Sequence, residues 1–468
     1  MNSILLKGGT VVSGTALRKA DVLIEGGRIA RVSRPGEAEP LPEGSETVDV
    51  SGRFLFPGFI DTHTHFQMQA AECVTADDFD SGTRAALAGG TTCILDFTTQ
   101  DKGASLMEAL DHWHEMADGH CSCDYSFHMS ITDWNDSVRK EIPLMTREGI
   151  TSYKVYMAYR NLRISDREIY EIMQAIGEQG GILGTHCENG DLIDAVTLSL
   201  KSRGITGTEA HPIAHSREIE SEAVNRYLTI ADAAGVPVNI VHLSTKQSLE
   251  FARAARGRGQ TVLIETCPQY FFLDDSLYSL PDFEGAKYVF SPPARRKEDQ
   301  EALWKALEAG EVDTIGTDHC SFNFSTEKKL GLHDFSRIPN GIPGTEQRPV
   351  LMYTYGVRGG HITEPDLCRL LSENAAKEYG MYPQKGVIAE GSDADIVVWN
   401  PDAKWTVTAA GQVQHVDYTP YEGMPVCGIA EKVYLHGILA AENGRVTAPG
   451  KGRFVKRGPA DLSFRKQQ

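Results

Sequence analysis

A pair of histidines closes an apolar segment near the start of the chain, which reads Phe56-Pro57-Gly58-Phe59-Ile60-Asp61-Thr62-His63-Thr64-His65. Residues two positions apart in a β-strand point to the same face, so His63 and His65 can direct both imidazoles to one point. Imidazole nitrogens are common ligands of divalent metal ions, and that point could hold one. The pair could also be two ordinary strand histidines that only satisfy hydrogen bonds, so the metal interpretation depends on further ligands.

Three more candidate ligands stand where other apolar runs end. His186, His242 and Asp318 each come directly after a short segment of mainly apolar residues. Any one of them alone could be a core or capping residue. Three such endings together with the histidine pair favour a shared metal site.

Lys154 is the unusual residue of the set, because it lies inside the apolar segment 151–157. An unpaired ammonium is costly to bury, so this lysine must be paired, deprotonated or modified. Pairing with Asp96 or Glu188 is one alternative. Carboxylation is the other, since the two oxygens of a carbamate could bridge two cations that otherwise share a single acidic ligand. We favour N6-carboxylysine at position 154.

The candidate ligands divide between two ions. One ion would take His63, His65, Lys154 and Asp318, and the other would take Lys154, His186 and His242. Nitrogen and oxygen ligands suit Zn²⁺, with Mn²⁺ or another first-row ion as the alternative. Two such ions about 3.5–4 Å apart lower the pKa of a shared water and polarise a substrate oxygen. This combination is typical of hydrolases.

The elements that position these residues follow a repeating order. Apolar segments typical of strands fall at 54–65, 91–97, 124–131, 150–157, 181–186, 237–242, 260–266 and 312–318. Helical patterns lie between them, the clearest at 166–180 with apolar residues at positions 169, 172, 173 and 176. Eight alternations of strand and helix predict a (β/α)₈ TIM-type barrel, whose active site collects at the C-terminal ends of the strands.

The two ends of the chain have another pattern. Short apolar segments punctuated by glycine, as at Gly8-Gly9 and Gly26-Gly27, predict hairpins before residue 50, and similar segments return after residue 394. Neither end alone makes a convincing domain. We therefore predict a small β-sandwich domain formed by both chain termini, 1–53 and 385–468, with the barrel at 54–384 inserted.

Composition narrows the classes of partner. The 468 residues are 41% hydrophobic and carry a formal net charge of −18 without any basic run, which argues against nucleic-acid and anionic membrane partners. A small-molecule substrate fits better. No apolar run approaches the roughly 20 residues of a membrane span, and no signal peptide is recognisable, so we expect a cytoplasmic protein.

Several further motifs can be read along the chain. They are Asp61-Thr62-His63-Thr64-His65-Phe66-Gln67-Met68, the run 82–92, Lys154 with Tyr159, His186-Cys187-Glu188-Asn189-Gly190-Asp191, Glu265-Thr266-Cys267-Pro268-Gln269-Tyr270, Ser291-Pro292-Pro293 and Ile338-Pro339-Asn340-Gly341. Together they resemble the motifs of the bacterial dihydropyrimidinases, also called D-hydantoinases, among the cyclic amidohydrolases of the amidohydrolase superfamily. The resemblance covers nearly the whole chain and implies a homotetramer or homodimer.

The resemblance also implies roles for single residues. Tyr159 would hydrogen-bond the developing oxyanion, while Ser291 and Asn340 would hold the cyclic amide, largely through main-chain atoms. A metal-bridging hydroxide would attack the ring carbonyl, and Asp318 would carry the proton to the leaving nitrogen. Dihydropyrimidines and 5-substituted hydantoins would open to N-carbamoyl amino acids. Without the resemblance, the segments around Ser291 and Asn340 are simply turns.

Other functions of the same superfamily remain open. Allantoinase or another cyclic-ureide hydrolase is the main alternative, because the loop 69–73 departs from the family and loops at that end shape the substrate pocket. Dihydroorotases usually have an arginine where this chain has Gln67. A non-catalytic scaffold related to the collapsin-response mediator proteins is a further alternative, against which the complete ligand set argues.

Overall fold

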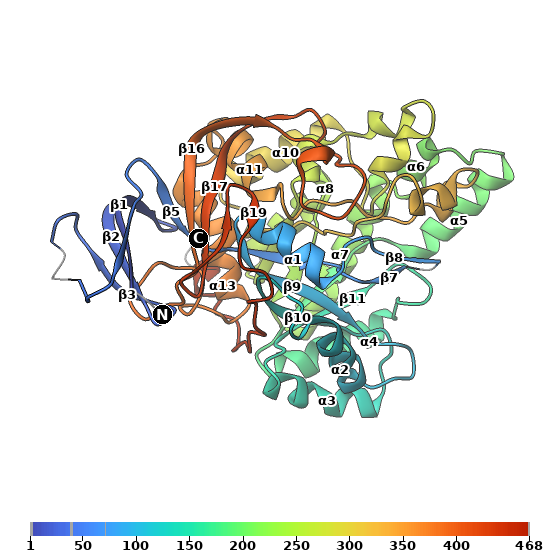
Figure 1. Cartoon of the computed structure of the whole chain (residues 1–468). Coiled ribbons are helices and arrows are strands. Elements are labelled where there is room, and N and C mark those ends of the chain that lie inside the picture. Colours follow the sequence, from blue (N-terminus) through green and yellow to red (C-terminus); the bar gives the residue numbers. More distant parts are fainter. Residues whose placement is uncertain (1–2, 38–40, 71, 467–468) are drawn as a thin grey trace.

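A parallel sheet of eight strands forms the centre of the computed structural model, which describes residues 3–37, 41–70 and 72–466 (Figure 1). In chain order the strands are β6 (Phe59–Thr64), β9 (Thr91–Thr99), β10 (Asp124–Ser130), β11 (Ser152–Tyr156), β12 (Ile182–His186), β13 (Val238–Ile240), β14 (Val262–Thr266) and β15 (Thr314–Ile315). Consecutive strands are neighbours in the sheet. A bridge between Thr64 and His319 joins the segment after β15 to β6, which closes the barrel.

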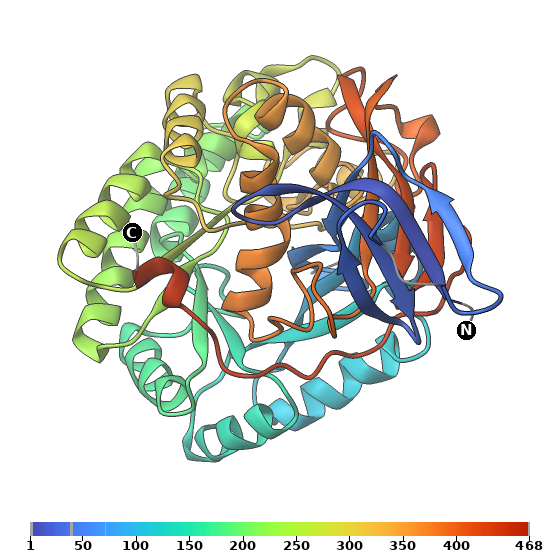
Figure 2. The same cartoon turned by 90° about the vertical axis from the view of Figure 1, so that its left-hand side faces the viewer.

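Helices connect the strands and surround the barrel (Figure 2). The longer ones are α1 (Phe79–Ala88), α2 (Leu106–Ala117), α3 (Asp136–Arg147), α4 (Asp166–Gly177), α5 (Gly190–Ser202), α7 (Arg217–Ala234), α8 (Lys246–Gly257) and α10 (Lys297–Glu308). The apolar stripe predicted at 166–180 is confirmed in α4, whose Ile169, Ile172 and Ile176 are buried. The Ser165 hydroxyl caps this helix by accepting a hydrogen bond from the Glu168 N–H.

Shorter elements fill the loops. The short helices are α6 (His211–Ala214), α9 (Gln269–Phe272), α11 (Arg348–Leu351), α12 (Glu364–Cys368), α13 (Asn374–Glu378) and α14 (Ser463–Lys466). A small hairpin of β7 (Gln69–Ala70) and β8 (Cys73–Val74) follows β6. No helix in the ranges that the structure describes has the length and apolar character needed to cross a bilayer.

Both ends of the chain contribute to a second, mixed sheet of nine strands (Figure 1). Its strands are β1 (Ile4–Val12), β2 (Leu17–Glu25), β3 (Arg28–Ser33), β4 (Glu46–Asp49), β5 (Phe54–Pro57), β16 (Ile396–Thr406), β17 (Pro425–Leu435), β18 (Ile438–Glu442) and β19 (Arg445–Val446). The N-terminal and C-terminal strands meet where β16 pairs with β5. An apolar cluster that includes Leu6, Val22 and Ile396 packs here, separate from the barrel core.

Two local predictions at glycines were wrong. The single strand predicted at 54–65 is two strands, and the chain passes at Gly58 from the mixed sheet into the barrel. A Cβ at Gly58 would lie 1.9 Å from the Thr92 Oγ1, so only glycine fits this crossing. At Gly8, where a hairpin was expected, β1 continues through a bulge with φ at 80°.

The division of the chain into domains remains a proposal. We keep the barrel at 54–384 and the terminal domain at 1–53 and 385–468. The four residues of β5 belong to the mixed sheet by their pairing with β1 and β16, although they stand directly before the first barrel strand.

A buried lysine joins the two sheets. The Lys385 Nζ lies 2.6 Å from a carboxylate oxygen of Asp124, the first residue of β10, and 2.6 Å from one of Asp395, which stands directly before β16. Asp393 lies 3.3 Å from the same nitrogen, and the His436 Nε2 lies 2.9 Å from the other Asp124 oxygen. The ammonium therefore neutralises acidic groups that come from both sheets.

We predict that Lys385→Met destabilises the protein strongly. The variant removes the cation that three buried carboxylates share and leaves Arg28 beside Asp393 and His436 beside Asp124. Breaking such a buried pair typically costs about 3–5 kcal/mol. The measurement is the denaturant midpoint of unfolding, with Lys404→Met, at an exposed position of β16, as the matched control. Equal midpoints for the two variants would show that the charge cluster does not hold the sheets together.

Candidate metal centre and active site

The six predicted metal ligands lie together at one end of the barrel. His63 and Lys154 belong to β6 and β11, and His186 is the last residue of β12. His65, His242 and Asp318 stand one to three residues beyond β6, β13 and β15. Because parallel strands bring their C-terminal ends to one rim, residues far apart in the sequence meet there.

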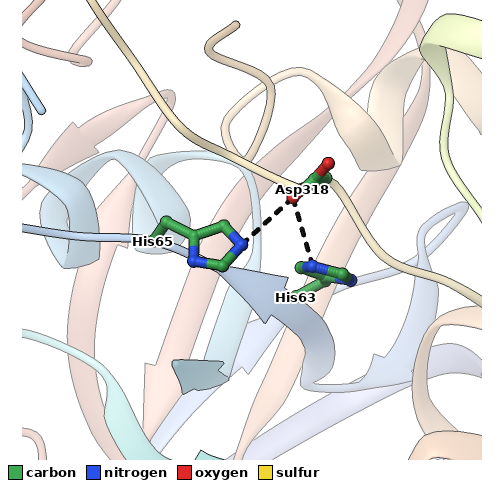
Figure 3. A group of neighbouring side chains, drawn as sticks. All are labelled: His63, His65 and Asp318. Carbon is green, nitrogen blue, oxygen red and sulfur yellow. Dashed lines mark ion pairs between the residues drawn. The ribbon is translucent and has the colours of Figure 1, made fainter. Parts of the chain in front are cut away.

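The first group contains His63, His65 and Asp318, whose ring nitrogens and carboxylate point toward one another (Figure 3). One carboxylate oxygen of Asp318 lies 3.1 Å from the His63 Nε2 and 3.2 Å from the His65 Nε2. The Lys154 Nζ lies 3.0 Å from the same His63 nitrogen. Three candidate ligand atoms thus surround one point, and the Lys154 amine lies beside one of them.

The second group contains His186 and His242. The His186 Nδ1 lies 3.0 Å from the His242 Nε2, and the His242 ring centre lies 5.5 Å from that of His63. Two adjacent clusters of nitrogen and oxygen atoms therefore face each other, as the proposed division between two ions requires. Bridging by a modified Lys154 stays a proposal.

The protonation states of His65, His242 and Asp318 suit metal ligands. Burial lowers the pKa of His65 to about 4 and holds the pKa of His242 well below its usual range, so both rings are neutral at neutral pH. Burial opposes ionisation of Asp318, but the charge of His63 and hydrogen bonds from His63 and His65 hold its pKa well below the ordinary value. Against burial and the Lys154 charge, the carboxylates of Asp318 and Glu265 raise the pKa of His63. Neutral imidazoles and a carboxylate are the forms that bind Zn²⁺ or Mn²⁺, so His63 would release its proton to an incoming ion.

The alternative pairings of Lys154 do not occur. Asp96 accepts hydrogen bonds from Thr64, Phe66 and Trp113, and the Glu188 carboxylate contacts His186 and His215.

Lys154 itself is only 2% exposed, and burial lowers its pKa against the opposing charges of Asp318 and Glu265. A buried amine without a carboxylate bonded to it fits the modified state.

Three of these site residues have strained backbones. Tyr159, His242 and Asp318 have φ angles of 64°, 39° and 54°, in the left-handed region that residues other than glycine rarely adopt. Such a conformation costs on the order of 1–3 kcal/mol and persists only where the surrounding structure enforces it. All three follow barrel strands, so the sharp turns direct their side chains into the site.

The predicted substrate residues converge beside the second histidine group. The Tyr159 ring centre lies 5.1 Å from that of His186, and the Asn340 side-chain amide donates to the Ser291 Oγ at 3.0 Å. Burial and then the Glu188 charge raise the pKa of Tyr159, while hydrogen bonding to Ser291 and Asn340 lowers it. The phenol therefore remains a proton donor at neutral pH.

Main-chain groups at this place are free. Within residues 3–37, 41–70 and 72–466, no hydrogen bond uses the backbone N–H or carbonyl of Ser291 or Asn340. Ser291 is buried and Asn340 is half-buried, so these open main-chain groups are suited to a polar ligand.

Comparison with known proteins identifies the family. The family model for the amidohydrolase family matches residues 54–439. The chain belongs to the amidohydrolase family.

Relatives of this amidohydrolase match over nearly the whole chain. A D-hydantoinase of Geobacillus stearothermophilus is 42% identical over 97% of this chain and 96% of its own, and a dihydropyrimidinase of Rattus norvegicus is 38% identical over 97% and 89%. The crystal structure of a dihydropyrimidinase from Brevibacillus agri superposes with a TM-score of 0.95 at 40% identity, over 98% of this chain and 99% of that one. The barrel and the separate terminal sheet are thus the architecture of this family.

Two glutamates orient the rings of the candidate ligands His63 and His186. One carboxylate oxygen of Glu265 lies 2.7 Å from the His63 Nδ1, and the other accepts a hydrogen bond from the Thr62 hydroxyl at 2.6 Å. A carboxylate oxygen of Glu188 lies 2.9 Å from the His186 Nε2. Each carboxylate takes the N–H of one ring nitrogen and leaves the other nitrogen for the ion. Glu265 was missed as a functional residue, although it stands near the end of an apolar strand like the ligands themselves.

We predict that Glu265→Gln weakens metal binding by about 10- to 100-fold, because partners of this kind have effects of that size. The substitution keeps the shape of the side chain but removes the charge that fixes the His63 tautomer. The measurement is metal affinity by titration of the chelator-treated protein. The control is Glu311→Gln, because Glu311 pairs with Arg253 and does not contact the candidate ligands. Equal metal affinities for the two variants would contradict the role of Glu265 in orienting His63.

Proposed function

We propose that this protein hydrolyses the ring amide of neutral cyclic ureides, namely dihydropyrimidines and 5-substituted hydantoins, to N-carbamoyl amino acids. The observation that carries the proposal is the convergence of six metal-ligand side chains with Tyr159, Ser291 and Asn340 at one end of the barrel. Relatives named D-hydantoinase and dihydropyrimidinase match over the full length.

The ligand set is suited to two divalent ions, for which we infer Zn²⁺, with Mn²⁺ as the alternative. Such ions, when bound, lower the pKa of a shared water and polarise the amide carbonyl. The residues supply the rest. The buried Tyr159 phenol stays protonated and donates a hydrogen bond to the oxyanion, and the loops of Ser291 and Asn340 hold the ring.

Asp318 is placed to move the proton. Its side chain is 15% exposed, whereas those of His63 and His65 are 0% and 8% exposed, so this carboxylate borders both the ion site and the space for substrate. One of its oxygens contacts both histidines, and the second has no hydrogen-bond partner within the described residues. We infer that this second oxygen takes the proton of the attacking water and delivers it to the leaving ring nitrogen.

We also propose a cytoplasmic homotetramer or homodimer. The oligomeric state rests on the sequence resemblance, and the location is the expectation stated from the sequence.

We predict that Lys154→Ala loses bound metal and nearly all activity, because N6-carboxylysine at this position would bridge the ions. The cavity left by the shortened side chain can admit a small acid. Acetate or propionate added with metal should therefore restore part of the activity to Lys154→Ala while leaving the unmodified enzyme unchanged. Activity of Lys154→Ala that persists without added acid would contradict the bridging role.

We further predict that dihydrouracil and phenylhydantoin are opened well and dihydroorotate poorly. The extra carboxylate of dihydroorotate loses water on entry, and a buried charge costs several kcal/mol unless a cation receives it. Gln67 is neutral, and Arg160 and Arg163 are already paired with Asp194 and Asp191 at 2.8 and 2.7 Å.

The test is kcat/KM for dihydrouracil, phenylhydantoin, allantoin and dihydroorotate on one metal-loaded preparation. Dihydroorotate or allantoin ranking first would overturn the proposed substrate class. No turnover of any of the four would overturn the proposed function itself.

A further inference from the structure

A second buried lysine has no acidic partner. Lys328 lies in a short 3₁₀ helix, Glu327–Gly331, and its exposed fraction is 0%. Within the described residues it forms no ion pair, and its ammonium instead donates to three main-chain carbonyls. The distances are 2.8 Å to Val289, 2.8 Å to Pro339 and 2.7 Å to Gly341. All three N–H donors of the ammonium are thereby used.

These carbonyls come from the two loops that the proposed function places around the substrate. Val289 stands two residues before Ser291, and Pro339 and Gly341 flank Asn340 on either side. The loops are also tied directly, since the Gly341 N–H donates to the Val289 carbonyl at 3.0 Å. The Lys328 ammonium therefore joins the loop of Ser291 to the loop of Asn340.

The contacts fix the direction of the Asn340 main chain. In a trans peptide the carbonyl and the following N–H point in opposite directions. Because the Pro339 carbonyl is directed at Lys328, the Asn340 N–H is turned away from it. Because the Gly341 N–H is directed at Val289, the Asn340 carbonyl is turned away from that residue in the same manner. Both groups are left without partners and available to a ligand, as described above.

The burial of a charged side chain at position 328 costs free energy. Burying an ammonium without a counter-ion is costly, and an apolar side chain of the same length would avoid that cost. Three carbonyls aimed at one point repel one another unless a cation or strong donor lies between them. The charge of Lys328 thus permits a loop geometry that an apolar residue could not maintain.

We propose that Lys328 is a positioning residue for the substrate: its ammonium holds the loops of Ser291 and Asn340 so that the main-chain groups of Asn340 meet the polar edge of the cyclic ureide. The inference rests on the proposed function. It assigns Lys328 a role in substrate affinity and no role in metal binding or proton transfer.

The test is Lys328→Met, which keeps the length of the side chain and removes the donors. We expect kcat/KM for dihydrouracil and hydantoin to fall about 10- to 100-fold, mainly through a higher KM, since hydrogen bonds to charged groups have effects of this size. Metal content should stay at the level of the unmodified enzyme. Lys329→Met, the same substitution at the exposed neighbour in the same turn, should leave KM unchanged.

A second variant keeps the inference testable if Lys328→Met does not fold. Lys328→Gln retains two N–H donors on a shorter side chain and should give a KM between those of the unmodified enzyme and Lys328→Met. An unchanged KM in either variant, or a loss that follows metal content and leaves KM unaltered, would overturn the inference. If the unmodified enzyme opens neither ring, the proposed function has failed instead, so the two failures are distinguishable.

Discussion

An ammonium group cannot be buried without compensation, and much of this structure depends on how three buried lysines are compensated. Lys385 lies among carboxylates from both sheets and joins them. Lys328 has three carbonyls in place of an acid. Lys154 has neither, and its closest polar contact is a histidine nitrogen at 3.0 Å. The proposed carboxylation would remove that positive charge and would supply the acidic ligand that two ions need.

The barrel makes this arrangement rigid. Eight parallel strands bring His63, His186 and Asp318 to one rim. Glu265 and Glu188 bind one nitrogen of the His63 and His186 rings and so fix which nitrogen faces the proposed ions. The strained backbones of Tyr159, His242 and Asp318 lie where strands end and loops begin. The stability of the sheet thus offsets local strain at the positions that the proposed function places beside the substrate.

Sequence reasoning reached the barrel and selected six candidate ligands that the fold brings together, because both follow from local signals. Strand periodicity located all eight barrel strands, and polar residues that end apolar runs located His186, His242 and Asp318. It missed the break at Gly58, because the contact that requires glycine there comes from Thr92, outside the segment. The role of Lys328 was equally hidden, since its partners are backbone carbonyls distant in the sequence, which side-chain patterns cannot show. Domain boundaries, metal identity and oligomeric state remain predictions.

The central claim is that Lys154 carries a carbamate that completes the metal centre. The most direct measurement is ¹³C NMR of chelator-treated protein reconstituted with metal and ¹³C-labelled bicarbonate. The account predicts one carbamate resonance in the active protein, absent from Lys154→Ala prepared in the same way. Full activity and two bound ions without such a resonance would contradict it.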